Sequence, residues 1–209
     1  MEQGVFISIE GGEGVGKSTQ IKALAEALRS RGKDVVVTRE PGGTDGAEAI
    51  RQLLLSGSAD RWEAGAEALL FAAARSDHVK RLIKPALKAG KWVISDRFLD
   101  SSRAYQGGGS GFNDDDILEL HRIGSDGFLP SRTLILALKE REAASRASER
   151  DGASSDRIQD RESSFHEQVH RSFEHFAEME PERVRLVDAN GSPEDVTARL
   201  LNELSDLLA

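Results

Sequence analysis

The segment Gly11-Gly12-Glu13-Gly14-Val15-Gly16-Lys17-Ser18 lies between an apolar, β-prone run at residues 5–9 and a stretch rich in alanine and leucine. A strand, a glycine-rich loop and a helix in this order are typical of a phosphate-binding P-loop. Glycines allow backbone N–H groups to surround a β-phosphate, and the start of the helix adds a partial positive charge. Lys17 would reach the β- and γ-phosphate oxygens, and the Ser18 hydroxyl can coordinate Mg²⁺. We therefore expect all eight residues to bind a nucleoside triphosphate.

Four further apolar, β-prone runs follow, at residues 35–38, 92–95, 133–137 and 184–187. Helical periodicity predicts helices at residues 17–31, 44–55, 63–89, 114–125, 140–149, 162–179 and 193–209, with a bend near Pro85 in the third. Strands that alternate with helices are typical of a parallel sheet. The prediction is an α/β fold with a five-stranded parallel sheet and helices on both faces.

The composition of the chain limits its organisation and its partners. The 209 residues contain no linker rich in proline, glycine or serine, so we expect a single domain spanning residues 1–209. The net charge of −8, without a lysine- or arginine-rich block, disfavours a nucleic-acid polymer and favours a small phosphorylated substrate. The absence of cysteine excludes disulfides, thiolate nucleophiles and cysteine-based zinc sites.

No segment of the sequence has the features of a membrane span or a leader. The apolar runs are far shorter than a membrane span, and Met1 is followed by Glu2 rather than by a basic and then an apolar region. We therefore expect no signal peptide and no transmembrane helix. The expected location is the cytoplasm, without contact to a membrane.

Ligands of parallel α/β sheets bind beyond the carboxyl ends of the strands, so the residues after each run are the main candidates. Asp96 and Arg97 follow the third run; the carboxylate could hold Mg²⁺ or its water, and the arginine would point into the same crevice. The turn Thr38-Arg39-Glu40-Pro41-Gly42-Gly43 ends the second run, either as part of this crevice or as a solvated turn. Residues 141–161, rich in arginine, serine and aspartate, follow the fourth as a lid or as a solvated charged helix.

Two further groups of residues are suited to a nucleotide base. Phe71 and Arg75 are four residues apart, which places them on one face of an expected helix. Residues 101–109 combine hydroxyl groups, an amide and a glycine run, a set that can contact a base edge and a sugar. The alternatives are a core phenylalanine and an ordinary glycine loop.

The ordered combination of these motifs resembles the bacterial thymidylate kinases, which transfer the γ-phosphoryl group of ATP to dTMP. The match runs from the P-loop and the turn at residues 39–43 through Phe71-Ala72-Ala73-Ala74-Arg75, Asp96-Arg97 and Ala104-Tyr105-Gln106-Gly107 to Asp156-Arg157 and the final helix. It covers nearly the whole chain. The resemblance implies a P-loop nucleoside monophosphate kinase-like fold with an arginine-rich lid at about residues 141–161. It also implies ATP and Mg²⁺ as cofactors.

By position, the resemblance assigns residues to the base and sugar of dTMP. It implies that Phe71 stacks on thymine, while Arg75 and Gln106 contact the polar edge of the base. Ser102 helps to hold the base. Tyr105 packs beside the deoxyribose, where a 2′-hydroxyl would crowd it.

The resemblance also assigns residues around the dTMP phosphate. Arg97, with help from Arg51, would hold that phosphate, and Glu13 would lie near the 3′-hydroxyl of the sugar. Glu40 and Pro41 complete the expected dTMP site. Ser18 and Asp96 are the expected metal-binding residues, the latter directly or through water.

The family divides by whether the P-loop itself provides an arginine, and here that position is Gly14. The resemblance therefore implies the class in which the lid supplies the charge. The expected catalytic residues are Lys17, Asp96, Arg97, Arg146, Arg150 and Arg157. The chain departs from the family's usual residues at Ala137, at Glu140-Arg141 and at Gln159, so the individual lid contacts stay open.

The resemblance predicts an ATP:dTMP phosphotransferase that forms dTDP for dTTP synthesis. The alternatives are another nucleotide or nucleoside kinase, because the scaffold accepts many acceptors, and a nucleotide-binding switch without transfer activity. The chain lacks the Asn-Lys-x-Asp motif with which GTPases read guanine, which disfavours the switch. The family forms homodimers, and the alanine-rich stretch at residues 64–74 would allow close helix packing between two copies.

Overall fold

The computed structural model describes residues 4–12, 14–58, 60–138, 158, 161 and 163–208. Five parallel strands form one sheet: β1 (Phe6–Glu10), β2 (Val35–Arg39), β3 (Trp92–Asp96), β4 (Arg132–Ala137) and β5 (Val184–Asp188). Their order across the sheet is β2-β3-β1-β4-β5. The register pairs Ile9 of the central strand with Asp96 of β3 and with Leu134 of β4. The carboxyl ends of β1, β2 and β3 therefore lie side by side.

Helical segments connect the strands. They are α1 (Lys17–Arg29), α2 (Asp45–Leu55), α3 (Ala64–His78), the π-helical η1 (Val79–Ile83), α4 (Lys84–Lys88), α5 (Leu99–Ser102), the π-helical η2 (Arg103–Gly109), α6 (Asp114–Ser125), α8 (Ser163–Met179), α9 (Pro193–Asn202) and α10 (Ser205–Leu208). Side-chain caps define several starts: Thr44 accepts a hydrogen bond from the Ala47 N–H, and Ser192 forms a capping box with Asp195. Gly32, with φ of 80°, follows the end of α1.

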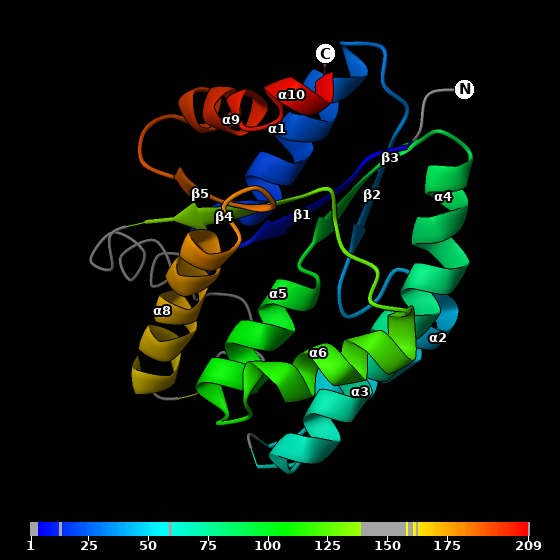
Figure 1. The fold of residues 1–209 in the computed structure, drawn as a ribbon, viewed down its shortest axis with the longest axis vertical. Helices are drawn as coiled ribbons and strands as arrows, with labels where there is room; N and C mark the ends of the chain where they lie inside the picture. The colour runs from blue at the N-terminus through cyan, green and yellow to red at the C-terminus, as the bar shows by residue number, and fades with distance from the viewer. Residues whose placement is uncertain are drawn as a thin grey trace.

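The helices lie on both faces of the sheet (Figure 1). On one face, Leu24 of α1 and Leu200 of α9 pack on Ile94 and neighbouring strand residues. On the other, Phe6 and Val93 pack against segments from η1 to α6, and Ile135 packs with side chains of η2 and α8. Each fully buried aliphatic or aromatic side chain contributes about 1.5–3 kcal/mol to folding. These two cores hold the strand ends rigid beneath the pocket described below.

The predicted α/β fold is confirmed, and all five expected strands are present within one residue at each end. The expected bend near Pro85 takes the form of the π-helical turn η1, directly before α4. Proline has no N–H to donate to the preceding turn, so the helical hydrogen-bond pattern changes there. Helical structure at residues 99–109 was not expected. The helix expected at residues 140–149 lies outside the described residues.

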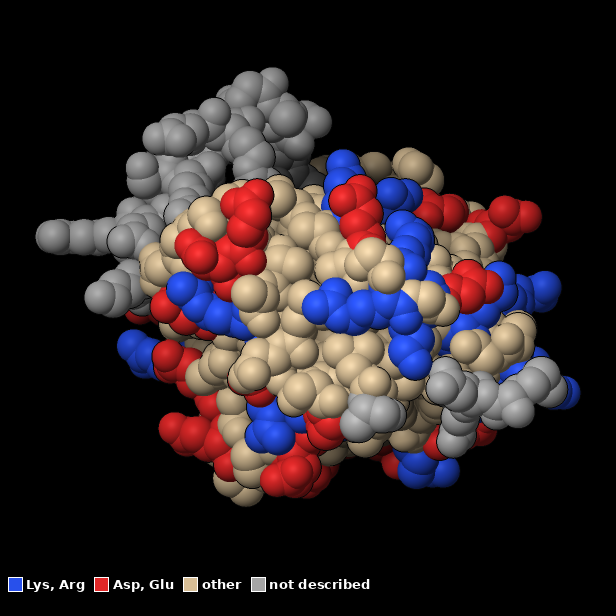
Figure 2. All heavy atoms as spheres, turned by 90° about the horizontal axis from the view of Figure 1, so that it is seen from above, with Lys and Arg blue, Asp and Glu red and all other residues tan. Residues whose placement is uncertain are grey.

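Within the described parts of the chain, no helix is long and apolar enough to cross a membrane. The expected cytoplasmic location stays a prediction. Figure 2 shows the face that carries α1, α9 and α10, where basic and acidic side chains are interspersed.

Candidate active site

The loop between β1 and α1 has the geometry of a phosphate cradle. Gly11 has φ of 132°, and a Cβ atom there would lie 2.6 Å from the carbonyl oxygen of Leu136, so only glycine fits. Lys17 Nζ donates hydrogen bonds to the carbonyl oxygens of Gly11 at 3.0 Å and Gly12 at 2.6 Å. The ammonium group is thereby held over the loop, and Ser18 is exposed in the first turn of α1.

Asp96 lies at the carboxyl end of β3, in register with Ile9 of β1. Its Oδ1 atom is buried, and none of the described residues forms a hydrogen bond with it. A buried carboxylate oxygen without a protein partner is suited to a metal-bound water, because Mg²⁺ keeps much of its water shell in proteins. No cluster of three or more His, Cys, Asp or Glu side chains that could hold a metal alone occurs among residues the structure describes. The two expected metal ligands, Ser18 and Asp96, therefore fit an ion that is also held by phosphate oxygens.

Arg97 connects the cradle to the neighbouring pocket. Its Nη1 donates to the Gly11 carbonyl oxygen at 3.2 Å and to Ser101 Oγ at 3.1 Å, and its guanidinium lies 5.0 Å from the Tyr105 ring centre. Burial opposes the charged form, but Tyr105, Glu10 and other acidic neighbours hold the pKa of Arg97 above its ordinary value. Its φ of 69° is rare for a residue with a side chain and costs about 1–3 kcal/mol. The surrounding structure therefore fixes this cation in place.

Glu10 is a buried carboxyl group that the sequence analysis missed. Ser8 Oγ and the Phe98 N–H each donate to its Oε1 at 2.7 Å, and Ser101 Oγ donates to its Oε2 at 2.5 Å. Because Ser101 also accepts from Arg97, Glu10 supports the turn that carries the arginine. Its position directly after the first apolar run was a signal that could have identified it.

Burial, with a smaller contribution from Asp100, raises the pKa of Glu10 to about 7. In the unfolded chain this carboxyl titrates at about 4.3, so unfolded chains lose the proton first as the pH rises. Below a pH of about 4.3, the contribution of Glu10 to the free energy of unfolding is therefore complete. This contribution is lost as the pH rises through about 7, where Glu10 of the folded protein also loses its proton. The total loss is about 4 kcal/mol.

We expect Glu10→Gln to remove this component of the pH dependence. Urea unfolding between pH 4.5 and 8 would show a smaller fall in the free energy of unfolding for the variant than for the unaltered protein. Other titrating groups occur in both proteins, so the difference isolates Glu10. Identical slopes would show that the Glu10 pKa is not raised.

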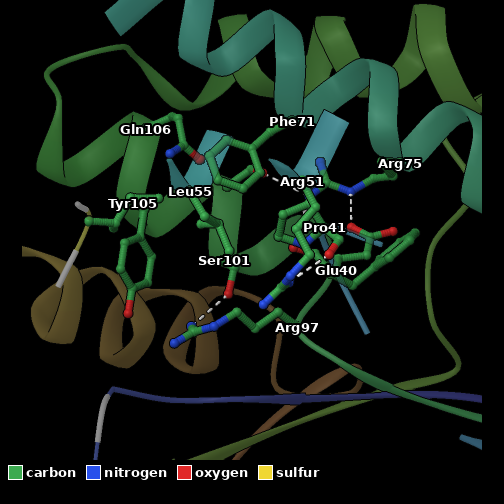
Figure 3. Close-up of a pocket in the computed structure, with 13 residues that line it drawn as sticks. Glu40, Pro41, Arg51, Leu55, Phe71, Arg75, Arg97, Ser101, Tyr105 and Gln106 are labelled. Carbon is green, nitrogen blue, oxygen red and sulfur yellow. Dashed lines mark hydrogen bonds and ion pairs between the residues drawn. The ribbon is translucent and has the colours of Figure 1, made fainter. Parts of the chain in front are cut away.

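A pocket of about 610 Å³ of empty space, partly open to solvent, lies beside the cradle (Figure 3). Its lining includes every described residue that the sequence analysis assigned to dTMP: Glu40, Pro41, Arg51, Phe71, Arg75, Arg97, Ser102, Tyr105 and Gln106. Leu55, Phe98, Ser101 and Ile158 complete it. Side chains from the ends of β2 and β3 and from α2, α3, α5 and η2 therefore meet at one place.

Arg75 is held by a network of hydrogen bonds within the pocket wall. Its Nε donates to Glu40 Oε2 at 2.8 Å, and its Nη2 donates to Ser102 Oγ at 2.7 Å and to the Phe98 carbonyl oxygen at 3.1 Å. Glu40 Oε1 in turn lies 2.9 Å from His78 Nδ1. In the part of the chain that is described, no group accepts a hydrogen bond from Arg75 Nη1, which is therefore the donor available to a ligand.

The turn after β2 closes over this network. A Cβ atom at Gly43, which has φ of 88°, would lie 2.4 Å from Thr38 Oγ1 and 2.6 Å from His78 Nε2. Those two atoms are 2.7 Å apart, and an Nδ1-protonated histidine would accept from the threonine while donating to Glu40. His78 was not predicted, because a buried histidine gives no signal in the sequence.

The other pocket residues come from separate elements. Arg51 Nη1 donates to the carbonyl oxygen of Pro41 at 2.7 Å, which directs α2 toward the turn after β2. Phe71 is half-buried, and both Phe71 and Leu55 pack against the apolar cluster formed by side chains of η2 and α8. Figure 3 shows both residues at the pocket. Tyr105 is buried and meets Phe165 edge to face at 5.9 Å between ring centres. The pocket therefore has an aromatic wall and a cationic floor.

Four predicted site residues lie outside the described part of the chain. They are Glu13, Arg146, Arg150 and Arg157. Glu140, Arg141 and Gln159 also lie outside it, whereas Ala137 ends β4 and is in register with Asp188 of β5. The roles assigned to these arginines and to Glu13 stay predictions.

Comparison with known proteins identifies the family of this chain. A profile of the family "Thymidylate kinase" matches residues 9–200. The thymidylate kinase of Rhizorhabdus wittichii is 62% identical over 205 residues, which cover 98% of this chain and 99% of that protein. The thymidylate kinase of Caulobacter vibrioides is 48% identical, over 96% of this chain and 95% of that protein.

A solved structure agrees with these matches. The crystal structure of thymidylate kinase from Ehrlichia chaffeensis superposes with a TM-score of 0.77 and 31% identity, covering 97% of this chain and 99% of that one. The sequence matches span nearly the whole length of the relatives, and the strand order and the pocket residues agree with the motifs. The chain therefore belongs to the thymidylate kinase family.

Proposed function

We propose that the pocket beside the P-loop binds dTMP and that the loop binds ATP, so that one phosphoryl transfer between them gives dTDP and ADP. Phosphorylation of dTMP is the reaction of the family to which the chain belongs. One observation carries the proposed placement: nine residues assigned to dTMP by motif line a single pocket, and Arg97 extends from that pocket to Gly11.

The reaction requires no general base in this site. The second pKa of a phosphate monoester is about 6, so the acceptor is largely a dianion at neutral pH and already nucleophilic. The protein must align two anions that repel each other and neutralise the charge on the transferring group. Lys17 on the donor side and Arg97 on the acceptor side are cations held in place for this task.

Mg²⁺ would be held by the Ser18 hydroxyl and, through water, by Asp96. Bound there with the ATP phosphates, it would neutralise part of their negative charge. The support is the buried Asp96 Oδ1 without a partner among the described residues, at the end of the strand beside β1, which leads into the P-loop. Asp96 also contributes to the raised pKa of Arg97, so its negative charge stabilises the charged form of the arginine.

The base would lie between the aromatic wall and the polar groups of the pocket. Phe71 offers a face for stacking, Arg75 Nη1 offers a donor, and Gln106 offers an amide at the same wall. Tyr105 would pack against the sugar, and Arg97 with Arg51 would hold the phosphate.

We expect Phe71→Ala to weaken dTMP binding by about 10- to 100-fold, because stacking on an aromatic ring contributes about 1–3 kcal/mol per base. ATP binding should not change, since Phe71 lies in the pocket and not in the P-loop. Calorimetric titration with each nucleotide measures both values. An equal loss for both ligands would show that Phe71 acts as a core residue instead.

An acceptor panel tests the proposed function. ADP production would be measured with dTMP, dUMP, AMP, CMP, GMP and thymidine, each with ATP and Mg²⁺. We expect dTMP to give the highest kcat/KM of the panel. Preference for another acceptor, or hydrolysis that no acceptor stimulates, would contradict the proposal.

We also propose that the protein is a homodimer. Leu53, Leu69 and Ile123 are 42%, 59% and 67% exposed and lie on α2, α3 and α6. These helices pack together on one side of the fold, α3 between the other two. Sedimentation velocity would give the mass in solution, and a monomer across the micromolar range would contradict the proposal.

A further inference from the structure

The side-chain amide of Gln106 is held in one orientation by a buried carboxylate. Gln106 Nε2 lies 3.0 Å from Glu67 Oε1, and the two side chains belong to residues that are 1% and 0% exposed. A carboxylate only accepts hydrogen bonds, whereas an amide both donates and accepts. A reversed amide would place its oxygen against the carboxylate, two acceptors together without water, which is costly in a buried site. Glu67 therefore selects the orientation in which the nitrogen faces it.

Arg161 occupies the other side of Glu67. Its Nη2 lies 2.8 Å from Glu67 Oε2 and 3.0 Å from Oε1, so both carboxylate oxygens act as acceptors. Arg161 also bonds Ser110 and lies over the Phe165 ring, at 4.6 Å from its centre. The charge of the buried carboxylate is thus paired, and its position behind Gln106 is fixed from two sides.

The fixed orientation determines what Gln106 presents to the pocket. In Figure 3 the amide oxygen of Gln106 lies on the side of Phe71, opposite the nitrogen. Among the described residues, none donates a hydrogen bond to that oxygen. The pocket wall therefore offers an acceptor at Gln106 and a donor at Arg75 Nη1.

This pattern distinguishes pyrimidine bases. Thymine presents a donor, N3–H, next to an acceptor, O4, which complements an acceptor followed by a donor. Cytosine presents the reverse, an acceptor at N3 and a donor at the amino group. We infer that Glu67 is a specificity-determining positioning residue, which fixes Gln106 to accept a hydrogen bond from N3–H of the acceptor base. The inference rests on the proposed placement of dTMP in this pocket.

The substitution Glu67→Gln tests the inference. A neutral amide at position 67 can accept from Gln106 Nε2 or donate to its oxygen, so the orientation of Gln106 is no longer fixed. We expect KM for dTMP to rise roughly tenfold with kcat within about twofold, the size of one lost hydrogen bond. One of the two mismatches of cytosine is relieved, so the ratio of kcat/KM for dTMP to that for dCMP should fall roughly tenfold. KM for ATP should not change.

Glu63→Gln is the matched control, because it removes the same charge one helical turn earlier, at the exposed start of α3. It should leave both the KM for dTMP and the selectivity unchanged. Glu67→Asp is a second variant that keeps the charge opposite Arg161 but shortens the reach toward Gln106. It should also lower the selectivity, which gives a result if the glutamine variant does not fold.

The possible results distinguish a failure of the inference about Glu67 from a failure of the proposed placement of dTMP. An unchanged dTMP-to-dCMP ratio in both Glu67 variants, with Phe71→Ala still weakening dTMP binding, would overturn the inference about Glu67 alone. If Phe71→Ala also leaves dTMP binding unchanged, the proposed placement of dTMP fails instead. A ratio that falls in both Glu67 variants but not in Glu63→Gln supports the positioning role.

Discussion

Replacing Arg97 by alanine should lower kcat/KM for dTMP about a thousandfold, one of the two largest effects that we expect in this protein. Arg97 is a partly buried cation placed between the P-loop carbonyl of Gly11 and the acceptor pocket. Removing one partner of a buried charge pair costs about 2–5 kcal/mol, and a thousandfold is about 4 kcal/mol. Steady-state kinetics with dTMP varied at saturating ATP measures the effect.

Arg39→Ala is the matched control for Arg97. Arg39 ends the neighbouring strand β2, but its side chain is 55% exposed and pairs with Glu48 rather than lining the pocket. An exposed pair of this kind contributes about 0–1 kcal/mol, so the control should change kcat/KM by less than about fivefold. If both variants lose activity equally, charge in general and not the position of Arg97 would account for the result.

The second large effect is expected for Arg150→Ala, which should lower kcat about a thousandfold and change KM for dTMP much less. The reason comes from the sequence: Gly14 leaves the P-loop without an arginine, and a charge donated directly to a transferring phosphoryl group contributes about 10³–10⁵ in rate. Arg150 lies outside the described residues, so its role rests on the resemblance of the lid motif. Single-turnover kinetics measures the chemical step.

Arg141→Ala provides a comparison within the same arginine-rich segment, at a position where the chain departs from the family. It should retain kcat within a few-fold. An unchanged kcat for Arg150→Ala would remove Arg150 from this role.

The fold and most of the pocket could be predicted because their signals are local. Apolar runs gave the strands, and glycines with Lys17 gave the cradle, since each motif is contiguous in sequence. Glu40 and Arg97 could then be placed together, because parallel strands end at the same side of the sheet. Nine residues of the pocket were therefore assigned to it through the resemblance of these motifs, whereas Leu55, Phe98, Ser101 and Ile158 were not.

What escaped prediction depends on burial and on long-range contacts. Glu67 and Gln106 are 39 residues apart, and a lone glutamate on a helix is ordinarily solvated. Glu10 looks like part of the glycine loop until its burial is known. Helical structure at residues 99–109 was missed because the glycines of η2 have low helix propensity, and its π-helical turns do not follow the usual period.

A crystal structure of the protein with dTMP would show whether dTMP lies in the pocket between Phe71 and Arg97. We expect thymine stacked on Phe71, N3 within hydrogen-bond distance of Gln106 Oε1, and the phosphate on Arg97. Density for dTMP elsewhere, without contact to Phe71 or Arg97, would show that the proposed placement of dTMP is wrong.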